Sequence, residues 1–238
     1  NKKYEPDLIY TAGEYTKKLF KKKSNIPVKV LGSNRYFIKL KKRGKYLLKK
    51  NINCLVIPEG MLSECIKIFN FSLLAAKYSP EIKFIWRLHP SMNFNQTLDQ
   101  LKLDRDILPK NIILSKNNFF DDVSISSMCI YRGSTSVITA LQSGVYPIYF
   151  NNHEFLNIDP IYALKKWKTC INDIEDFKKF ISVNFNKEKN NIVNKKIAIK
   201  FALEYFKKLN FKNLIIEIKK DKNKIGNKIL LNKYNNSL

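Results

Sequence analysis

The feature that most constrains the fold is a regular alternation between short apolar runs and segments with helical periodicity. The apolar runs lie at residues 53–58, 82–88, 111–114, 128–131, 146–150 and 167–171. The helical segments between them lie at residues 61–77, within 94–103, and at 119–126, 135–142 and 158–166. Strands buried on both faces read as continuous apolar runs, and strand–helix alternation favours a parallel sheet. The pattern therefore predicts an α/β, Rossmann-like, doubly wound parallel sheet.

The two ends of the chain differ from this central pattern. Residues 1–50 contain two strand-like runs that end in turns at Gly13 and Gly32, with one helix between them. Such a unit is too small to bury a core alone. We interpret residues 1–50 as the tail of a preceding α/β domain plus a linker, and residues 51–185 as the Rossmann-like domain. Residues 186–238 are expected to hold a C-terminal helix, at 192–209, and a basic, loosely ordered tail from residue 219.

The basic residues are concentrated in the flanks of this 238-residue chain, whose net charge is +24. Residues 1–53 carry 16 Lys and Arg against 3 Asp and Glu, residues 54–160 carry 9 against 10, and residues 161–238 carry 19 against 7. One explanation is a biased composition, because Lys, Asn and Ile are all frequent. The other is a basic face held at an anionic membrane surface. A specific nucleic-acid reader would be expected to use more Arg.

Cysteine usage and apolar run length indicate a location in the cytoplasm. The four cysteines, Cys54, Cys65, Cys129 and Cys170, match no metal or disulfide spacing. We expect all four to be small buried hydrophobes in a reducing compartment. Every apolar run is far shorter than the roughly 20 residues of a membrane span. The protein is thus expected in the cytoplasm, with a peripheral position on the inner face of the membrane as an extension of that prediction.

Polar residues follow three of the predicted strands, at the edge where open parallel sheets bind ligands. These residues are Glu59 and Gly60 after the first strand, Arg87, His89 and Pro90 after the second, and Arg132, Gly133, Ser134, Thr135 and Ser136 after the fourth. The last group leads into a helix, whose N-terminal N–H groups attract phosphate. The alternative is that these hydroxyls only cap the helix. For His89 the alternatives are a structural histidine and a donor to phosphate, and His153 is the only other histidine.

Two of these motifs carry a family resemblance. His89-Pro90, followed 45 residues later by Ser134-Thr135-Ser136, resembles the C-terminal, donor-binding half of GT-B glycosyltransferases. It looks most like the bacterial sialyl-, polysialyl- and Kdo transferases, which use CMP-activated sugars in capsule and lipopolysaccharide synthesis. The teichoic-acid glycerophosphotransferases, which use a CDP donor, share a similar pair. The resemblance implies that His89 contacts the donor phosphate and assists departure of CMP, and that the three hydroxyls hold phosphate or ribose.

The resemblance also implies where this chain departs from the family. The sialyltransferases carry their catalytic base in an acidic-acidic-Gly motif on the N-terminal domain, whereas Pro58-Glu59-Gly60 has one carboxylate and lies in the second domain. Glu59 is therefore expected to shape the interdomain cleft rather than act as the base. The base would lie on a first domain that is mostly absent, so this chain alone is expected to bind donor without transferring sugar. The C-terminal helix would pack back toward that domain.

No metal or other cofactor is predicted. Asp121 and Asp122 stand at a helix start, where acidic side chains suit the helix dipole. A positive helix end, Arg87 and His89 would supply the electrostatic work of a metal.

Three hypotheses follow. The first is a glycosyltransferase donor domain that binds a nucleotide-sugar and serves a glycan or lipid-linked acceptor at an anionic membrane. The second is a non-enzymatic, basic α/β protein that binds nucleic acid. The third is a UDP-sugar epimerase of the same architecture. The basic residues avoid residues 54–160, where the polar strand ends lie, and a polynucleotide groove would place charge beside its platform. The transferase is therefore favoured, and no nucleic-acid partner is expected.

Overall fold

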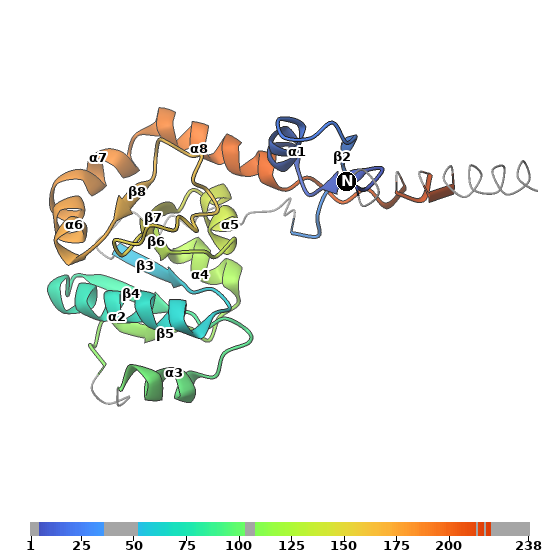
Figure 1. Cartoon of the computed structure of the whole chain (residues 1–238). Coiled ribbons are helices and arrows are strands. Elements are labelled where there is room, and N and C mark those ends of the chain that lie inside the picture. The colour runs from blue at the N-terminus through green and yellow to red at the C-terminus, as the bar shows by residue number, and fades with distance from the viewer. Residues whose placement is uncertain (1–4, 36–51, 103–107, 213, 217, 220–238) are drawn as a thin grey trace, which may run out of the picture. The chain divides into compact units, whose positions relative to one another are not determined.

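The computed structural model describes residues 5–35, 52–102, 108–212, 214–216 and 218–219. The strands are β1 (Ile9–Thr11), β2 (Val28–Val30), β3 (Ile52–Ile57), β4 (Ile82–Trp86), β5 (Ile112–Leu114), β6 (Met128–Tyr131), β7 (Tyr146–Phe150) and β8 (Thr169–Ile171). The helices are α1 (Glu14–Lys21), α2 (Leu62–Tyr78), α3 (Phe94–Leu101), α4 (Phe119–Ile125), α5 (Ser136–Gln142), α6 (Ile174–Lys179), α7 (Phe185–Lys189) and α8 (Ile192–Tyr205). The chain divides into two compact units, residues 1–38 with 203–238, and residues 39–202 (Figure 1).

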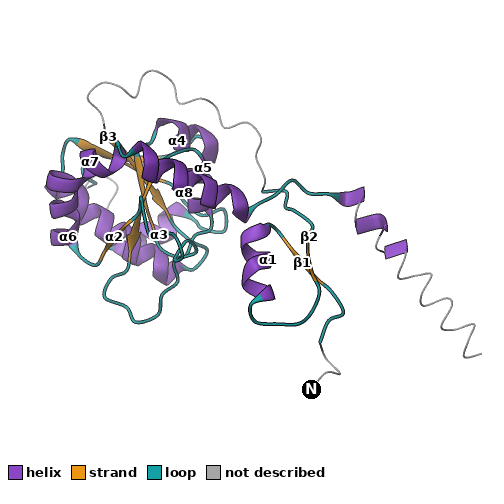
Figure 2. Cartoon of the chain, turned by 90° about the horizontal axis from the view of Figure 1, so that it is seen from above, coloured by secondary structure: helices purple, strands orange, loops and turns teal. Residues whose placement is uncertain are grey.

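The larger unit contains a six-stranded sheet in which every paired strand is parallel. Its strand order is β5-β4-β3-β6-β7-β8. The chain runs outward from β3 to β5, returns to β6, and then runs outward to β8 on the other side. Figure 2 shows α2, α3 and α6 on one side of the strands and α4, α5 and α8 on the other. The predicted doubly wound α/β fold is therefore confirmed, with its switch point between β3 and β6.

The burial of β3, β6 and β7 explains why these strands could be predicted from the sequence pattern. All residues of β6 and β7 and four of the six in β3 are buried. Helix α2 covers one face with buried Phe69, Phe71 and Ala75. The Phe71 and Phe150 rings stack with their centroids 4.3 Å apart. The buried Trp86 indole donates to the Ser72 hydroxyl at 2.9 Å, so the largest core side chain keeps its hydrogen bond.

The smaller unit joins the N-terminal segment to the segment after α8. The two strands and the helix between them that the sequence predicted are β1, α1 and β2. Strands β1 and β2 pair in parallel. A bridge joins Ser33 to Lys208, and the Lys207 N–H donates to the Ala12 carbonyl at 2.9 Å. A Cβ atom at Gly13 would lie 2.2 Å from the Tyr205 carbonyl oxygen. Only glycine allows this approach of two backbone segments.

Several sequence-based boundaries were wrong. Residues 158–166 form turns rather than a helix. Here the buried Asp159 carboxylate accepts from the Ile161 N–H at 2.9 Å and from the Tyr131 hydroxyl at 2.9 Å. These bonds hold the segment to β6 and give its backbone an alternative to helical bonding.

Further differences concern the C-terminal half and the cysteines. Helices α6 and α7 are joined by a π-helical turn (Phe180–Asn184), and α8 ends at Tyr205 rather than residue 209. Cys170 is exposed on the edge strand β8, whereas the other three cysteines are buried. The predicted linker and nearly all of the predicted tail lie outside the described residues. Within the described part, no helix combines the length and apolarity that crossing a membrane requires.

Candidate functional site

The candidate site lies at the carboxyl ends of β3, β4 and β6. Strand β3 pairs with β4 on one side and β6 on the other, with Val56 opposite Trp86 and Ile57 opposite Tyr131. The three loops that carry the predicted site residues therefore begin side by side. This is the switch point of the sheet, where the diverging chain leaves a crevice suited to a ligand. The expectation that these strand ends share one edge is confirmed.

Glu59 and Gly133 are in direct contact across the switch point. The Gly133 N–H donates to Glu59 Oε1 at 3.3 Å. A Cβ atom at position 133 would lie 2.2 Å from Glu59 Oε2. Gly133 thus leaves the space that the Glu59 carboxylate fills. Burial raises the pKa of Glu59, against the lowering effect of the Gly133 N–H.

His89 lies over Gly60 and is oriented by Ser91. A Cβ atom at Gly60 would lie 3.3 Å from His89 Cε1. The Ser91 N–H donates to His89 Nδ1 at 3.3 Å, and the Ser91 hydroxyl lies 2.7 Å from the same nitrogen. Because Nδ1 accepts from a backbone donor, the neutral ring carries its proton on Nε2. His89 therefore presents an Nε2–H donor for which the described residues supply no acceptor. The exposed Pro90 follows it in the turn.

The three hydroxyls of the loop before α5 occupy different environments. Ser134 is buried, Thr135 is exposed and Ser136 is half-buried. Thr135 holds the N-cap position but makes no side-chain capping bond. Among the described residues, none forms a hydrogen bond with the Ser134 or Ser136 hydroxyl. Side-chain capping at Thr135, the alternative for this run, is thus not observed.

The surroundings of Arg132 differ from those expected of a residue that binds the nucleotide-sugar donor. Its side chain is 2% exposed, with Nε donating to Glu64 at 2.5 Å and Nη2 to Glu154 at 2.7 Å. Nη1 donates to the carbonyls of Phe150 and Asn151 at 2.8 and 3.1 Å. Four of its five N–H groups are therefore used within the protein. Arg132 holds the ends of β6 and β7 together, and we correct its predicted role from donor contact to positioning.

Arg87 is likewise anchored by the protein. Its Nη1 donates to Asp122 Oδ2 and to the Asn117 carbonyl, both at 2.8 Å, and its guanidinium lies 5.6 Å from the centre of the Phe119 ring. Asp122 is fully buried and also accepts from the Ser115 hydroxyl at 2.5 Å. Because the Arg87 side chain remains 26% exposed, it keeps an open side at the rim.

Several residues of this edge were missed by sequence reasoning. Glu64, Lys67 and Glu154 form the ion-pair network around Arg132, with Lys67 Nζ 2.7 Å from Glu64 and 2.6 Å from Glu154. The local sequence does not predict that these residues surround Arg132, because Glu154 is far from Glu64 and Lys67 in the chain. A different omission was visible in the sequence. Residues 104–106 read Asp-Arg-Asp, the Asp-x-Asp spacing that can hold a metal, and they lie outside the described residues.

The carboxylates around Arg132 make the stability of the fold depend on pH in the acid range. Burial alone would raise the pKa of Glu64, but hydrogen bonds from Lys67 and Arg132 outweigh it and lower that pKa. The hydrogen bond from Lys67 lowers the pKa of Glu154. A carboxylate whose pKa is lower in the folded state stabilises the fold above its unfolded pKa, and this contribution is lost as pH falls through the folded value.

We therefore expect the melting temperature to fall as pH drops below about 4.5, the ordinary pKa range of glutamate. Glu59 has the opposite sign, because its pKa is raised on folding and its protonation favours the folded state. A melting series from neutral to acid pH measures the balance. The Glu154→Gln variant, which removes one of the titrating carboxylates, should show a shallower decline than the unchanged chain. An equal decline in both would contradict this assignment.

Comparisons with known proteins support the fold. No family model and no curated protein matches the sequence. The kitacinnamycin glycotransferase has a TM-score of 0.56 at 12% identity, over 89% of this chain and 55% of its own. A Listeria monocytogenes protein assigned as a UDP-N-acetylglucosamine 2-epimerase has a TM-score of 0.50 at 15% identity, over 84% and 55%. The wall teichoic acid polymerase TagF with CDPG has a TM-score of 0.50 at 13% identity, over 91% and 59%.

The chain has a GT-B-like, Rossmann-type fold. It spans between 55% and 59% of the lengths of these three proteins. The resemblance drawn from His89-Pro90 and Ser134-Thr135-Ser136 agrees with the similarity at this level of fold. The narrower assignment to transferases of CMP-activated sugars is a proposal.

Proposed function

We propose that this chain is the donor-binding part of a glycosyltransferase that uses a nucleotide-activated sugar, with a cytidine nucleotide as the carrier. The observation that supports the proposal is that His89, whose Nε2–H has no acceptor among the described residues, and Ser134, whose hydroxyl has no described partner, follow β4 and β6, the two strands that flank β3 at the switch point. Both side chains can donate a hydrogen bond, which suits a phosphate. The likeness to a glycotransferase and to TagF with CDPG gives the fold-level support.

His89 is proposed to assist departure of the nucleotide. As the bond between the sugar and the phosphate breaks, negative charge grows on the phosphate oxygen, and the Nε2–H would stabilise it. Ser91 fixes the ring in the tautomer that this role requires. Ser134, Thr135 and Ser136 are proposed to hold the phosphate or ribose. Glu59 shapes the crevice beside Gly133, and the general base for the acceptor is proposed to lie outside this chain.

The other partners are proposed on the same basis. The acceptor would be a glycan or a lipid-linked glycan of surface polysaccharide or lipopolysaccharide synthesis, met at the inner face of the membrane. The basic flanks at residues 1–53 and 161–238 would contact anionic lipid. Donor binding is proposed to need no metal. Because residues 104–106 have the Asp-x-Asp spacing that can hold a metal, binding is to be compared with and without Mg²⁺.

The test is the thermal stability of the chain with CMP, CDP, UDP, GDP or a short single-stranded RNA, each with Mg²⁺ or with EDTA. A ligand that binds only the folded state stabilises it by about 2.7 kcal/mol at a hundredfold excess over Kd. We expect CMP or CDP to raise the melting temperature equally in Mg²⁺ and EDTA. His89→Ala should weaken this binding about tenfold or more, because a hydrogen bond to a charged group is lost.

The matched control is His153→Ala. His153 is the other histidine, its side chain is 70% exposed, and its contact is with Asp173 at 3.5 Å. It should bind nucleotide as well as the unchanged chain. A shift with UDP alone would favour the epimerase, the second candidate, which the likeness to the Listeria protein supports. A salt-sensitive shift with RNA alone would overturn the enzyme proposal.

A further inference from the structure

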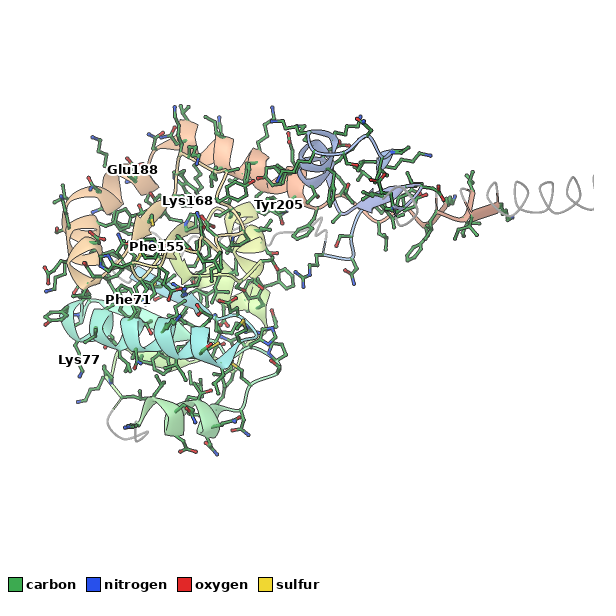
Figure 3. The ribbon with its side chains drawn as sticks, in the orientation of Figure 1. Phe71, Lys77, Phe155, Lys168, Glu188 and Tyr205 are labelled. Carbon is green, nitrogen blue, oxygen red and sulfur yellow. The ribbon has the colours of Figure 1, made fainter. Side chains whose placement is uncertain are left out.

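A cavity lies in the larger unit, beside the edge strand β8. Its volume is about 510 Å³, and its lining includes the first residues of two strands, Tyr146 of β7 and Thr169 of β8. Its walls come from the loop before β8 and from the helical segments that follow. Figure 3 labels Lys168 and Glu188, which line it from the loop and from α7. A cavity of this size suits a small ligand.

The cavity has an excess of unpaired positive charge. Lys165, Lys166 and Lys179 all line it. Within the described ranges, no carboxylate lies at ion-pair distance from any of the three. Lys168 also lines the cavity, but it is paired with Asp159 at 2.6 Å. All three lysines are exposed, so water screens their mutual repulsion, and an anionic group bound among them would have three cations to contact.

Trp167 fixes the loop that carries these lysines. Its backbone has φ +59°, the left-handed region, although its side chain is large. Such a conformation is strained for a large side chain and is concentrated at functional sites. The side chain is 1% exposed and packs edge-on against Tyr146, with ring centroids 5.2 Å apart. Its buried indole N–H finds no acceptor in the described part of the chain. The buried Trp167 side chain thus anchors the loop, with Lys166 and Lys168 on either side of it in the chain.

The remaining polar groups of the lining are suited to hydroxyls. Glu188 and Asp176 supply carboxylates, of which Asp176 Oδ2 also accepts from the Asn172 N–H at 2.9 Å, and Asn184 and Asn194 supply amides that both donate and accept. Lys165 also donates to the Tyr162 carbonyl at 3.3 Å. Two carboxylates beside the three ammonium groups would disfavour a bare small anion. They suit a ligand whose hydroxyls donate to the carboxylates while its anionic group contacts the lysines.

The aromatic residues of the lining argue against a polynucleotide. Tyr146, Trp167 and Phe180 are between 1% and 4% exposed. Binding of single-stranded nucleic acid relies on exposed aromatic faces on which bases stack. Buried rings form an apolar floor and offer no such platform.

We propose that this cavity binds a sugar ring carrying a phosphate or a carboxylate, as a glycan site separate from the His89 site. The choice of a glycan rests on the proposed function, whereas the choice of an anionic, hydroxyl-bearing ligand rests on the lining alone. The cavity is lined by the first residue of β7 and by all three residues of the edge strand β8, and His89 follows the carboxyl end of β4. Strands β3, β6 and β7 lie between β4 and β8 in the sheet, so an acidic glycan held at the cavity is held away from the donor.

The test is calorimetric titration of the whole chain with glucose 6-phosphate, glucuronate, glucose and inorganic phosphate. We expect the two anionic sugars to bind, and glucose or phosphate alone to bind at least about tenfold more weakly. Lys166→Glu and Lys179→Glu should each weaken binding of the anionic sugars about tenfold or more. The control is Lys77→Glu, a change at an exposed lysine of α2 that Figure 3 labels far from Lys168, and it should bind unchanged.

Each outcome has a defined meaning. Glucose 6-phosphate binding without glucuronate binding would narrow the anion to phosphate, and the reverse would narrow it to carboxylate. No binding of either sugar, equal binding by phosphate alone, or an equal loss in Lys77→Glu would overturn the cavity proposal. RNA binding that the two lysine variants abolish would also overturn it. The melting temperature serves as the fold check, because Lys166 and Lys179 are exposed and Lys166→Glu and Lys179→Glu should leave it unchanged. CMP binding tests the proposed function alone. The failure of either proposal is therefore visible without the other.

Discussion

Replacing Arg132 with methionine is expected to lower the free energy of unfolding by about 3–5 kcal/mol. The Arg132 side chain is 2% exposed and Glu64 is 12% exposed. Removing the guanidinium places an apolar side chain beside the Glu64 carboxylate, which keeps only Lys67 as a cation. It also removes the Arg132 donor from the Phe150 carbonyl, whereas the Asn151 carbonyl keeps the Glu154 N–H at 3.2 Å. Methionine keeps much of the volume, so a packing defect is a small part of the loss. Urea denaturation followed by circular dichroism near neutral pH measures the change.

The matched control is Lys67→Met, because Lys67 contacts the same two carboxylates. Lys67 Nζ lies 2.7 Å from Glu64 and 2.6 Å from Glu154, but its side chain is 35% exposed. Water screens this pair and replaces the lost contact, so the expected loss is about 1 kcal/mol or less. If both variants lost the same stability, the burial of Arg132 would not be the cause. If neither variant lost stability, the ion-pair network would contribute nothing to the free energy of unfolding.

The strand pattern was predictable because the central strands are buried on both faces. Met128–Tyr131 and Tyr146–Phe150 matched their predicted boundaries, and a strand of this kind needs no knowledge of its neighbours. Residues 158–166 were mispredicted for the converse reason. Their conformation depends on the Asp159 carboxylate. This carboxylate accepts a hydrogen bond from the Tyr131 hydroxyl of β6, 28 residues earlier in the chain, and another from Lys168. Periodicity carries no information on such tertiary hydrogen bonds.

The candidate site shows the same division between local and non-local information. Parallel strands end at one edge, so the proximity of Glu59, His89 and Gly133 followed from the predicted topology. The topology did not predict whether each charged side chain binds a ligand or another part of the protein. Arg132 and Glu64 are 68 residues apart, and the sequence offered no means to distinguish an arginine that binds ligand from one that binds a neighbouring loop.

Asp122→Ala is expected to lower the free energy of unfolding by about 3 kcal/mol and to release Arg87 from the rim of the site. The Asp122 carboxylate is 0% exposed and accepts from Arg87 at 2.8 Å, from Ser115 at 2.5 Å and from Asn117 at 3.2 Å. Its removal leaves the Ser115 hydroxyl and the Asn117 amide without this acceptor. Arg87 is 26% exposed, so water can hydrate part of its guanidinium, and this limits the loss.

The adjacent Asp121 provides the control, because Asp121→Ala changes the same helix turn without touching Arg87. Its carboxylate acts at the start of α4, where an acidic residue contributes about 0.3–1 kcal/mol through the helix dipole. Denaturation should separate the two variants clearly, and nucleotide titration should show weaker binding by Asp122→Ala alone, since Arg87 no longer faces the site from a fixed position. If Asp122→Ala unfolded more easily but bound CMP normally, Arg87 would support the fold of the β4 end and would have no part in donor recognition.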